Sequence, residues 1–401
     1  MLLEQLNGLL SKVNGVLWEW PMIILLLGTH LFLTIRLRFP QRHILKAFRI
    51  MRSPDRGAPG DISQMGSLST SLAATIGTGN IIGVATAITL GGPGAVFWCW
   101  ITGVLGISTK YAEGLLAVKY RVRTKDGKIL GGPMYAIERG LGWKWLAVLF
   151  CIFAAIASFC IGSSVQSNVA ASVLYDTFGI DHAVSGIIMA LLMLVVVVFG
   201  VRGIAKVCMM LVPFMGFLYI FGCIALLIVN RSFLPEAISV IIRCAFSSEA
   251  VSGGIVGQTI IMSMRYGIAR GLFSNESGLG SAPIIAAAAK TRNPVRQALV
   301  SSTSTFWDTV IICLLTGLVI VSSLVATDGS IADVDGMMLT QAAFARLNIR
   351  VGSMQLGSLI VDIAIIMFTF STIVGWCYYG ENPLNTSSAP DTIRWRACFS
   401  G

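Results

Sequence analysis

The stretch Thr75-Ile-Gly-Thr-Gly-Asn80 interrupts a long apolar segment with glycines and polar side chains. A second apolar segment, much later in the chain, is interrupted in the same way by Phe273-Ser-Asn-Glu-Ser-Gly-Leu-Gly-Ser-Ala-Pro283. Backbone that leaves a helix at membrane depth persists only where protein or a polar cavity satisfies its N–H and C=O groups. Paired interruptions of this kind are typical of a transporter's binding site. We therefore expect a buried polar site formed by the two breaks.

The composition indicates an integral membrane protein. Of its 401 residues 55% are hydrophobic and 12% are charged, with a mean hydropathy of +0.80, whereas soluble proteins average about 25% charged residues. The apolar runs are continuous and long enough to cross a bilayer as helices, unlike the alternating strands of a barrel. We predict an all-α polytopic helical bundle with one transmembrane domain over 1–381 and a polar tail over 382–401. Nine spans are expected, at 18–38, 62–90, 93–118, 145–174, 184–200, 208–229, 252–289, 297–325 and 355–379.

Positive charge is divided unequally between the loops. Alternate loops on one side hold 21 Lys and Arg residues, and the opposite loops hold five, which are Lys12, Arg231, Arg243, Arg346 and Arg350. Because Lys and Arg collect on the cytoplasmic side, we predict an external N-terminus and a cytoplasmic C-terminus in a bacterial-type cytoplasmic (inner) membrane. The net charge of +10 is then a topology signal, and nucleic acid is not an expected partner.

Nothing in the sequence indicates catalysis. Nine cysteines are scattered without a CxxC motif, and the three histidines form no metal-binding spacing. Gly77-Thr-Gly79 followed by Gly83 is close to a dinucleotide loop, but the spacing is off by one and no strand precedes it. We expect neither an enzyme nor a cofactor.

The first break has the chemistry to bind an anion and a cation together. Amides at the start of its second half-helix, near Gly77 to Ile81, carry the positive end of a helix dipole and suit a carboxylate. Carbonyls at the end of the preceding half-helix, from Ala73 to Ile76, suit a hard monovalent cation. Further oxygen donors nearby are Thr75, Thr78 and Asn80.

Charged residues inside the later spans have two interpretations each. Glu276 in the second break needs a partner or a proton, since a carboxylate in a span is costly. It could form a structural ion pair, with Arg270 as a candidate, or serve as a coupling-ion ligand or proton carrier. Asp308 raises the same question. Lys110 and Glu113 are expected to pair with each other at a membrane edge because they are three residues apart on a helix.

Polar residues of two further spans also allow more than one role. Gln166 is either interhelical glue or a substrate contact. Trp376 alone is typical of an interfacial belt, and the hydroxyls of Ser371 and Thr372 alone are typical of helix residues bonded back to their own carbonyls.

The sequence resembles the alanine or glycine:cation symporter family from Gly60 to Glu381. The resemblance rests on the stretches Thr75-Ile-Gly-Thr-Gly-Asn80, Gly91-Gly-Pro-Gly-Ala-Val-Phe97, Gly131-Gly-Pro-Met-Tyr135, Arg270-Gly-Leu-Phe-Ser-Asn-Glu-Ser-Gly-Leu-Gly-Ser-Ala-Pro283 and Phe370-Ser-Thr-Ile-Val-Gly-Trp-Cys-Tyr-Tyr-Gly-Glu381. It implies a leucine-transporter-like fold of two inverted five-helix repeats after one extra helix, with discontinuous helices at the midplane. It also implies symport of a small neutral amino acid with sodium across the bilayer.

The resemblance also implies a role for particular residues. Thr75, Gly77, Thr78, Gly79 and Asn80 would hold the substrate carboxylate. Gln166 would face the amino end, while Phe273 and Trp376 would wall a side-chain pocket sized for alanine, glycine or serine. A sodium ion would lie between the carbonyls of Ala73 and Ile76 and the hydroxyls of Ser371 and Thr372.

The sequence departs from the family pattern after Glu381. Family members continue with two further helices, whereas a polar tail follows here. The expectation is therefore a second repeat with three of its five helices, and the alternative function is a truncated, non-transporting membrane fragment.

Overall fold

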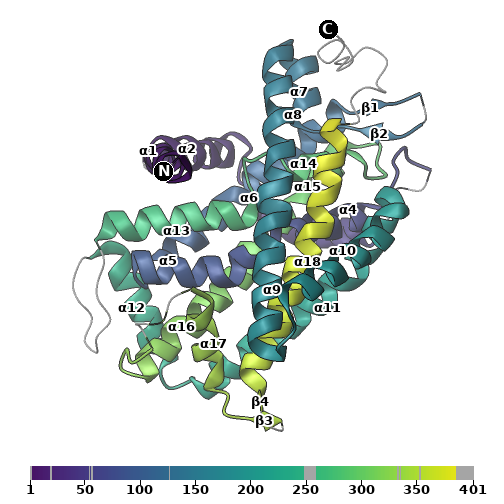
Figure 1. Ribbon diagram of the computed structural model, residues 1–401. Coiled ribbons are helices and arrows are strands. Elements are labelled where there is room, and N and C mark those ends of the chain that lie inside the picture. Colours follow the sequence, from purple (N-terminus) through teal and green to yellow (C-terminus); the bar gives the residue numbers. More distant parts are fainter. Residues whose placement is uncertain are drawn as a thin grey trace.

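The computed structural model describes residues 2–384 except 19, 54, 56, 126, 248–258, 332, 333, 335, 352 and 353, and it is built almost wholly from helices (Figure 1). The predicted tail lies outside the described residues from 385 onward. The first half of the chain comprises α1 (Leu2–Leu17), α2 (Trp20–Arg36), η1 (Pro40–His43), α3 (Ile44–Met51), α4 (Gln64–Thr75), η2 (Gly79–Gly83), α5 (Val84–Gly91), α6 (Ala95–Lys119), β1 (Val122–Arg123), β2 (Ile129–Leu130), α7 (Pro133–Ala136), η3 (Ile137–Leu141), α8 (Lys144–Phe159), η4 (Cys160–Ser164), α9 (Val165–Phe178) and α10 (His182–Val198).

The described part of the second half is also built mainly from helices. It comprises α11 (Gly200–Val229), α12 (Leu234–Phe246), α13 (Ile260–Asn275), α14 (Ala282–Ala287), α15 (Pro294–Thr305), η5 (Phe306–Cys313), α16 (Leu314–Ala326), α17 (Gly336–Ala345), β3 (Arg350–Val351), β4 (Met354–Gln355) and α18 (Leu356–Leu384). Within the described part of the chain the strands form two small antiparallel ribbons, β1 with β2 and β3 with β4.

Polar caps fix where the functional helices begin. The Ser63 hydroxyl accepts from Gly66 N–H at the start of α4, and the Thr259 hydroxyl accepts from Met262 N–H at the start of α13. Asn293 caps α15 by accepting from Val295 N–H, with Pro294 at the first helical position. Such caps satisfy N–H groups that lack an intrahelical partner.

The outer helices present apolar side chains outward. Phe153 on α8, Leu191 on α10 and Phe217 on α11 are each about three-fifths exposed, at 61%, 58% and 63%. Exposed apolar surface on this scale indicates contact with a membrane or a partner. A bilayer would remove the unfavourable contact of these side chains with water. The all-α membrane fold expected from composition is confirmed at this level.

The described helices supply four to six candidate membrane spans. By length and composition four described helical segments can cross a membrane, at Lys144–Phe178, Gly200–Val229, Pro294–Ala326 and Leu356–Glu381. Two bent pairs, Glu4–Leu17 with Trp20–Arg36 and Gln64–Thr75 with Gly79–Gly91, raise the total to six. The expected nine spans stay a prediction.

The two predicted interruptions lie inside the bundle, where Asn80 and Asn275 are buried. α6 packs along α13 and α15, while α18 contacts α4, α8, α9 and α11. In Figure 1 the yellow α18 runs beside α8 and α9, and α5 lies next to α13. This packing brings the end of α4, the end of α13 and the η5 segment together, although they are far apart in the sequence.

Candidate functional site

The first break is a sharp bend at Ile76 and Gly77. The helices before and after it, Gln64–Thr75 and Gly79–Gly91, are inclined by 53°. Gly77 N–H, which the helix no longer satisfies, donates to Asn80 Oδ1 at 2.9 Å. A Cβ atom on Gly77 would lie 2.5 Å from Thr372 Oγ1, so only glycine lets α18 approach this closely.

The second break spans residues 276–281. α13 ends at Asn275, whose Oδ1 accepts from Ser277 N–H at 2.9 Å, and Glu276 adopts the left-handed conformation with φ 53°. α14 begins at Ala282. Both breaks expected from the glycine and polar interruptions are therefore present.

Asp308 connects the two breaks. It is fully buried on η5, and its Oδ1 accepts from Asn80 Nδ2 of the first break at 2.7 Å. Its Oδ2 accepts from the hydroxyls of Ser274, on the second broken helix, at 2.9 Å and of Thr309 at 2.7 Å. One carboxylate thus binds both discontinuous helices.

Glu276 is held by α18 and by its own turn. Trp376 Nε1 donates to Glu276 Oε1 at 3.1 Å, and the Ser281 hydroxyl donates to Oε2. Within the described residues no ion pair joins Glu276 to Arg270, so this candidate partner is wrong. Trp376, expected to wall the pocket, is 5% exposed and anchors the turn through its indole N–H.

Lys110 and Glu113, on the neighbouring helix α6, bind the backbone of the second break. Lys110, 1% exposed, donates through Nζ to Glu276 O at 3.3 Å. Glu113 Oε1 accepts from the amides of Gly278 at 3.0 Å and Gly280 at 3.2 Å. The expected pair at a membrane edge is therefore wrong: the cation takes the carbonyl that ends one half-helix and the anion takes the amides that precede the next. The sequence feature that could have indicated this role is the presence of two charged residues inside an apolar run.

The four predicted cation ligands lie together at the end of α4. Ser371 Oγ is 3.3 Å from Ala73 O and 3.5 Å from Ile76 O. Thr372 Oγ1 is 3.3 Å from Ile76 O. The same hydroxyls make shorter contacts to Phe368 O, at 2.8 and 2.9 Å.

Gln166 lies against the first break. Its Nε2 is 3.3 Å from Thr78 Oγ1 and donates also to Ile161 O at 3.3 Å. Its buried Oε1 has no partner in the part of the chain that the structure describes, and it would lie 3.4 Å from a Cβ on Gly77.

The remaining residues implied by the resemblance lie around the same break. Thr75 bonds back to Ser71 O at 3.2 Å. A Cβ on Gly79 would lie 3.3 Å from Phe273 Cδ1, so Phe273 packs on the first break. Asn80 has both ends engaged, by Gly77 and by Asp308, and this geometry favours a bracing role over direct contact with a substrate carboxylate.

The fold resembles that of a solved membrane transporter. The crystal structure of an Eremococcus coleocola manganese transporter mutant superposes with a TM-score of 0.52 at 13% identity, over 80% of this chain and 68% of that one. Together with the apolar helices and the two joined breaks, this likeness defines the class as a polytopic helical membrane protein of transporter fold.

The chain belongs to the sodium:alanine symporter family, whose profile matches residues 3–395. An uncharacterized transporter of Haemophilus influenzae is 48% identical over 94% of this chain and 81% of its own length. The sodium/alanine symporter AgcS of Methanococcus maripaludis is 44% identical over 93% of this chain and 82% of its own length. The family resemblance drawn from the motifs is confirmed, as is the expectation of a transporter rather than an enzyme. The match runs past Glu381, where the resemblance was expected to stop.

Proposed function

We propose that the protein carries a small neutral amino acid together with sodium across the bacterial inner membrane. The observation that carries this proposal is the meeting of four oxygens from α4 and α18 beside an unsatisfied, buried amide oxygen on α9. One group suits a cation and the other an ammonium. The sodium/alanine symport named for the Methanococcus relative supports the same pair of ligands.

The directions of the Ser371 and Thr372 hydroxyl protons support the cation site. Ser371 and Thr372 each have one hydroxyl proton, and the shortest contact of each is to Phe368 O. When the protons point there, hydroxyl lone pairs face the carbonyls of Ala73 and Ile76 with no proton between them. Oxygens around a hard cation at about 2.3–2.6 Å lie about 3.3–3.7 Å apart in octahedral geometry. The oxygen separations of 3.3–3.5 Å match this spacing.

We place the proposed amino-acid site next to this cation. Gln166 Oε1 would accept from the substrate ammonium, and the amides that begin the half-helix at Thr78 and Gly79 would face the carboxylate. Phe273, packed on Gly79, would bound the side-chain pocket and favour alanine, glycine or serine. The proposal includes the inverted-repeat arrangement and transport by alternating access. The broken helices would then be the elements that contact both the amino acid and the sodium ion.

Counterflow of labelled alanine in proteoliposomes tests the proposal. We expect exchange in sodium buffer and none when potassium replaces sodium. Thr372→Ala should raise the sodium concentration for half-maximal exchange at least tenfold. Thr369→Ala is the matched control, since Thr369 is also a buried α18 hydroxyl but bonds back to Ile365 O and Ile366 O. Equal exchange in both salts would contradict sodium coupling.

A further inference from the structure

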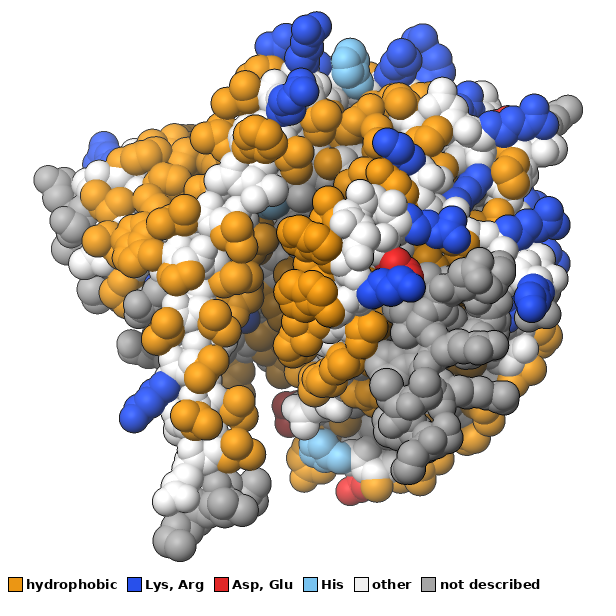
Figure 2. All heavy atoms as spheres, turned by 90° about the horizontal axis from the view of Figure 1, so that it is seen from above, with side chains coloured by type: hydrophobic (Ala, Val, Ile, Leu, Met, Phe, Trp, Pro, Cys, Tyr) orange, Lys and Arg blue, Asp and Glu red, His pale blue; other side chains and the backbone are white. Residues whose placement is uncertain are grey.

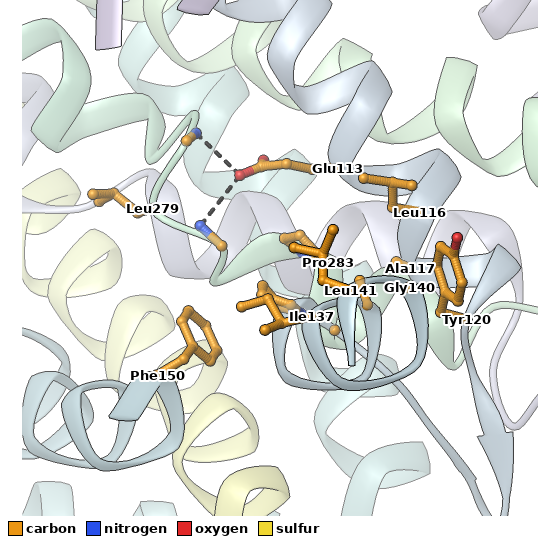
Figure 3. A pocket seen from close by; sticks show the side chains of 15 residues that line it. Glu113, Leu116, Ala117, Tyr120, Ile137, Gly140, Leu141, Phe150, Leu279 and Pro283 are labelled. Carbon is orange, nitrogen blue, oxygen red and sulfur yellow. Dashed lines mark hydrogen bonds between the residues drawn. The ribbon is translucent and has the colours of Figure 1, made fainter. Parts of the chain in front are cut away.

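A cavity of about 500 Å³ lies beside the second break, separate from the amino-acid site. It is a half-open cavity lined by α6, by the α7–η3 segment, by α8 and by the turn at 278–280 (Figure 3). Leu116, Ile137 and Phe150 contribute apolar walls. Its volume is within the about 300–1,000 Å³ typical of small-molecule sites.

Glu113 is the charged group in this cavity. Figure 3 shows its Oε1 accepting from two backbone amides of the turn, those of Gly278 and Gly280. Among the described residues its buried Oε2 has no hydrogen-bond partner. Because a buried acceptor without a donor is costly, the free oxygen favours a ligand that brings a donor, and its charge favours a cation.

We propose that this cavity binds a primary ammonium carried on a short apolar chain. The ammonium would donate to the Glu113 carboxylate, whose covered Oε2 a small side-chain rotation would expose to the cavity. The chain would lie along Leu116, Ile137 and Phe150. A free amino acid fits less well, because the Gly278 and Gly280 amides that could receive a carboxylate already donate to Glu113. Leu141 and Leu279 at the rim are 59% and 37% exposed, which suits a ligand arriving from the membrane interface.

The test is calorimetric titration of the purified full chain in nanodiscs with n-hexylamine and with n-hexanol, after subtraction of protein-free nanodiscs. We expect saturable binding of the amine at least tenfold tighter than that of the alcohol. Glu113→Gln, which keeps an oxygen acceptor for the turn amides, should abolish this preference. Glu138→Gln, a neutralised carboxylate on η3 that does not line the cavity, should retain it.

A second variant keeps the proposal testable if Glu113→Gln does not fold. Ile137→Trp adds volume inside the cavity from η3, leaves Glu113 itself unchanged, and should weaken amine binding at least tenfold. Equal binding of amine and alcohol, an unchanged preference in Glu113→Gln, or unchanged binding in Ile137→Trp would each overturn the proposal. The titration needs no transport, so this inference and the proposed symport can fail independently.

Discussion

At the scale of single residues, Asp308 determines how the two breaks meet. A buried carboxylate in a span is tolerated where donors surround it, and Asp308 receives its donors from Asn80, Ser274 and Thr309. Its position within an apolar span showed that it must have a role. Which helices it would join depended on contacts across more than two hundred residues of sequence, and no local pattern encodes these.

Replacing Asp308 with Asn should weaken both breaks at once. Asn has one acceptor oxygen where Asp has two, so either Asn80 or Ser274 would face an amide N–H instead. We expect a loss of about 1–3 kcal/mol of stability and at least a tenfold fall in sodium-driven alanine uptake. Thermal unfolding in detergent and uptake in proteoliposomes would measure the two effects.

Asp362→Asn is the matched control for this change. Asp362 is also a buried carboxylate, but it bonds to Thr177 and Gln341, away from both breaks. Its substitution should lower stability and leave the substrate KM unchanged. If Asp308→Asn transports as well as the wild type, Asp308 does not hold the site together.

Gln166→Leu tests the proposed contact between Gln166 and the substrate ammonium. Loss of one hydrogen bond to a charged group is worth about 1.5–3 kcal/mol, so the KM for alanine should rise about tenfold or more. The sodium dependence measured at saturating alanine should not change. Ser167→Ala on the same helix is the control, since the Ser167 hydroxyl donates to Ser164 O; an unaltered KM in Gln166→Leu would rule out the contact.

At the scale of elements, α6 functions as a clamp for the second break. Lys110 and Glu113 hold opposite ends of the turn with charges that match the helix dipoles, a cation at the end of α13 and an anion before α14. The breaks themselves could be predicted because glycines and polar residues interrupt apolar runs. The clamp could not be predicted, because two opposite charges three residues apart on a helix are equally well explained by an ion pair between them.

Lys110→Met should loosen this clamp. The buried Glu276 carbonyl would lose its donor, and the carboxylates of Glu113, Glu276 and Asp308 would lose a nearby positive charge. We expect stability to fall by about 1–3 kcal/mol, with faster hydrogen exchange in the peptide covering 276–281. Lys119→Met, at the exposed end of the same helix, should change neither quantity, and slow exchange in Lys110→Met would show that the clamp is dispensable.

At the scale of the whole molecule, both the charge distribution and the fold are typical of a helical membrane protein. Figure 2 shows Lys and Arg side chains scattered over the face that carries α7 and the β1–β2 ribbon, with few acidic side chains among them. Hydropathy predicted the all-helical membrane class because bilayer solvation demands long apolar helices. It did not fix the span count, since a broken or bent helix can be too short on each side to register alone.

Fusion reporters test the predicted orientation. Green fluorescent protein joined after residue 381 should fluoresce and alkaline phosphatase at the same position should be inactive, because this end is expected in the cytoplasm. Fusions after Arg231, in a loop expected on the opposite side, should give the reverse pattern. An active phosphatase after residue 381 would show that the topology is the reverse of the predicted one.

The most direct test of the account is equilibrium binding of labelled alanine to the purified protein in sodium and in potassium buffer. We predict saturable binding in sodium that falls at least tenfold in potassium, because we propose adjoining cation and amino-acid sites at the oxygens of Ala73, Ile76, Ser371 and Thr372 and at the Gln166 amide. Binding of equal strength in both buffers, or no alanine binding in sodium, would contradict it.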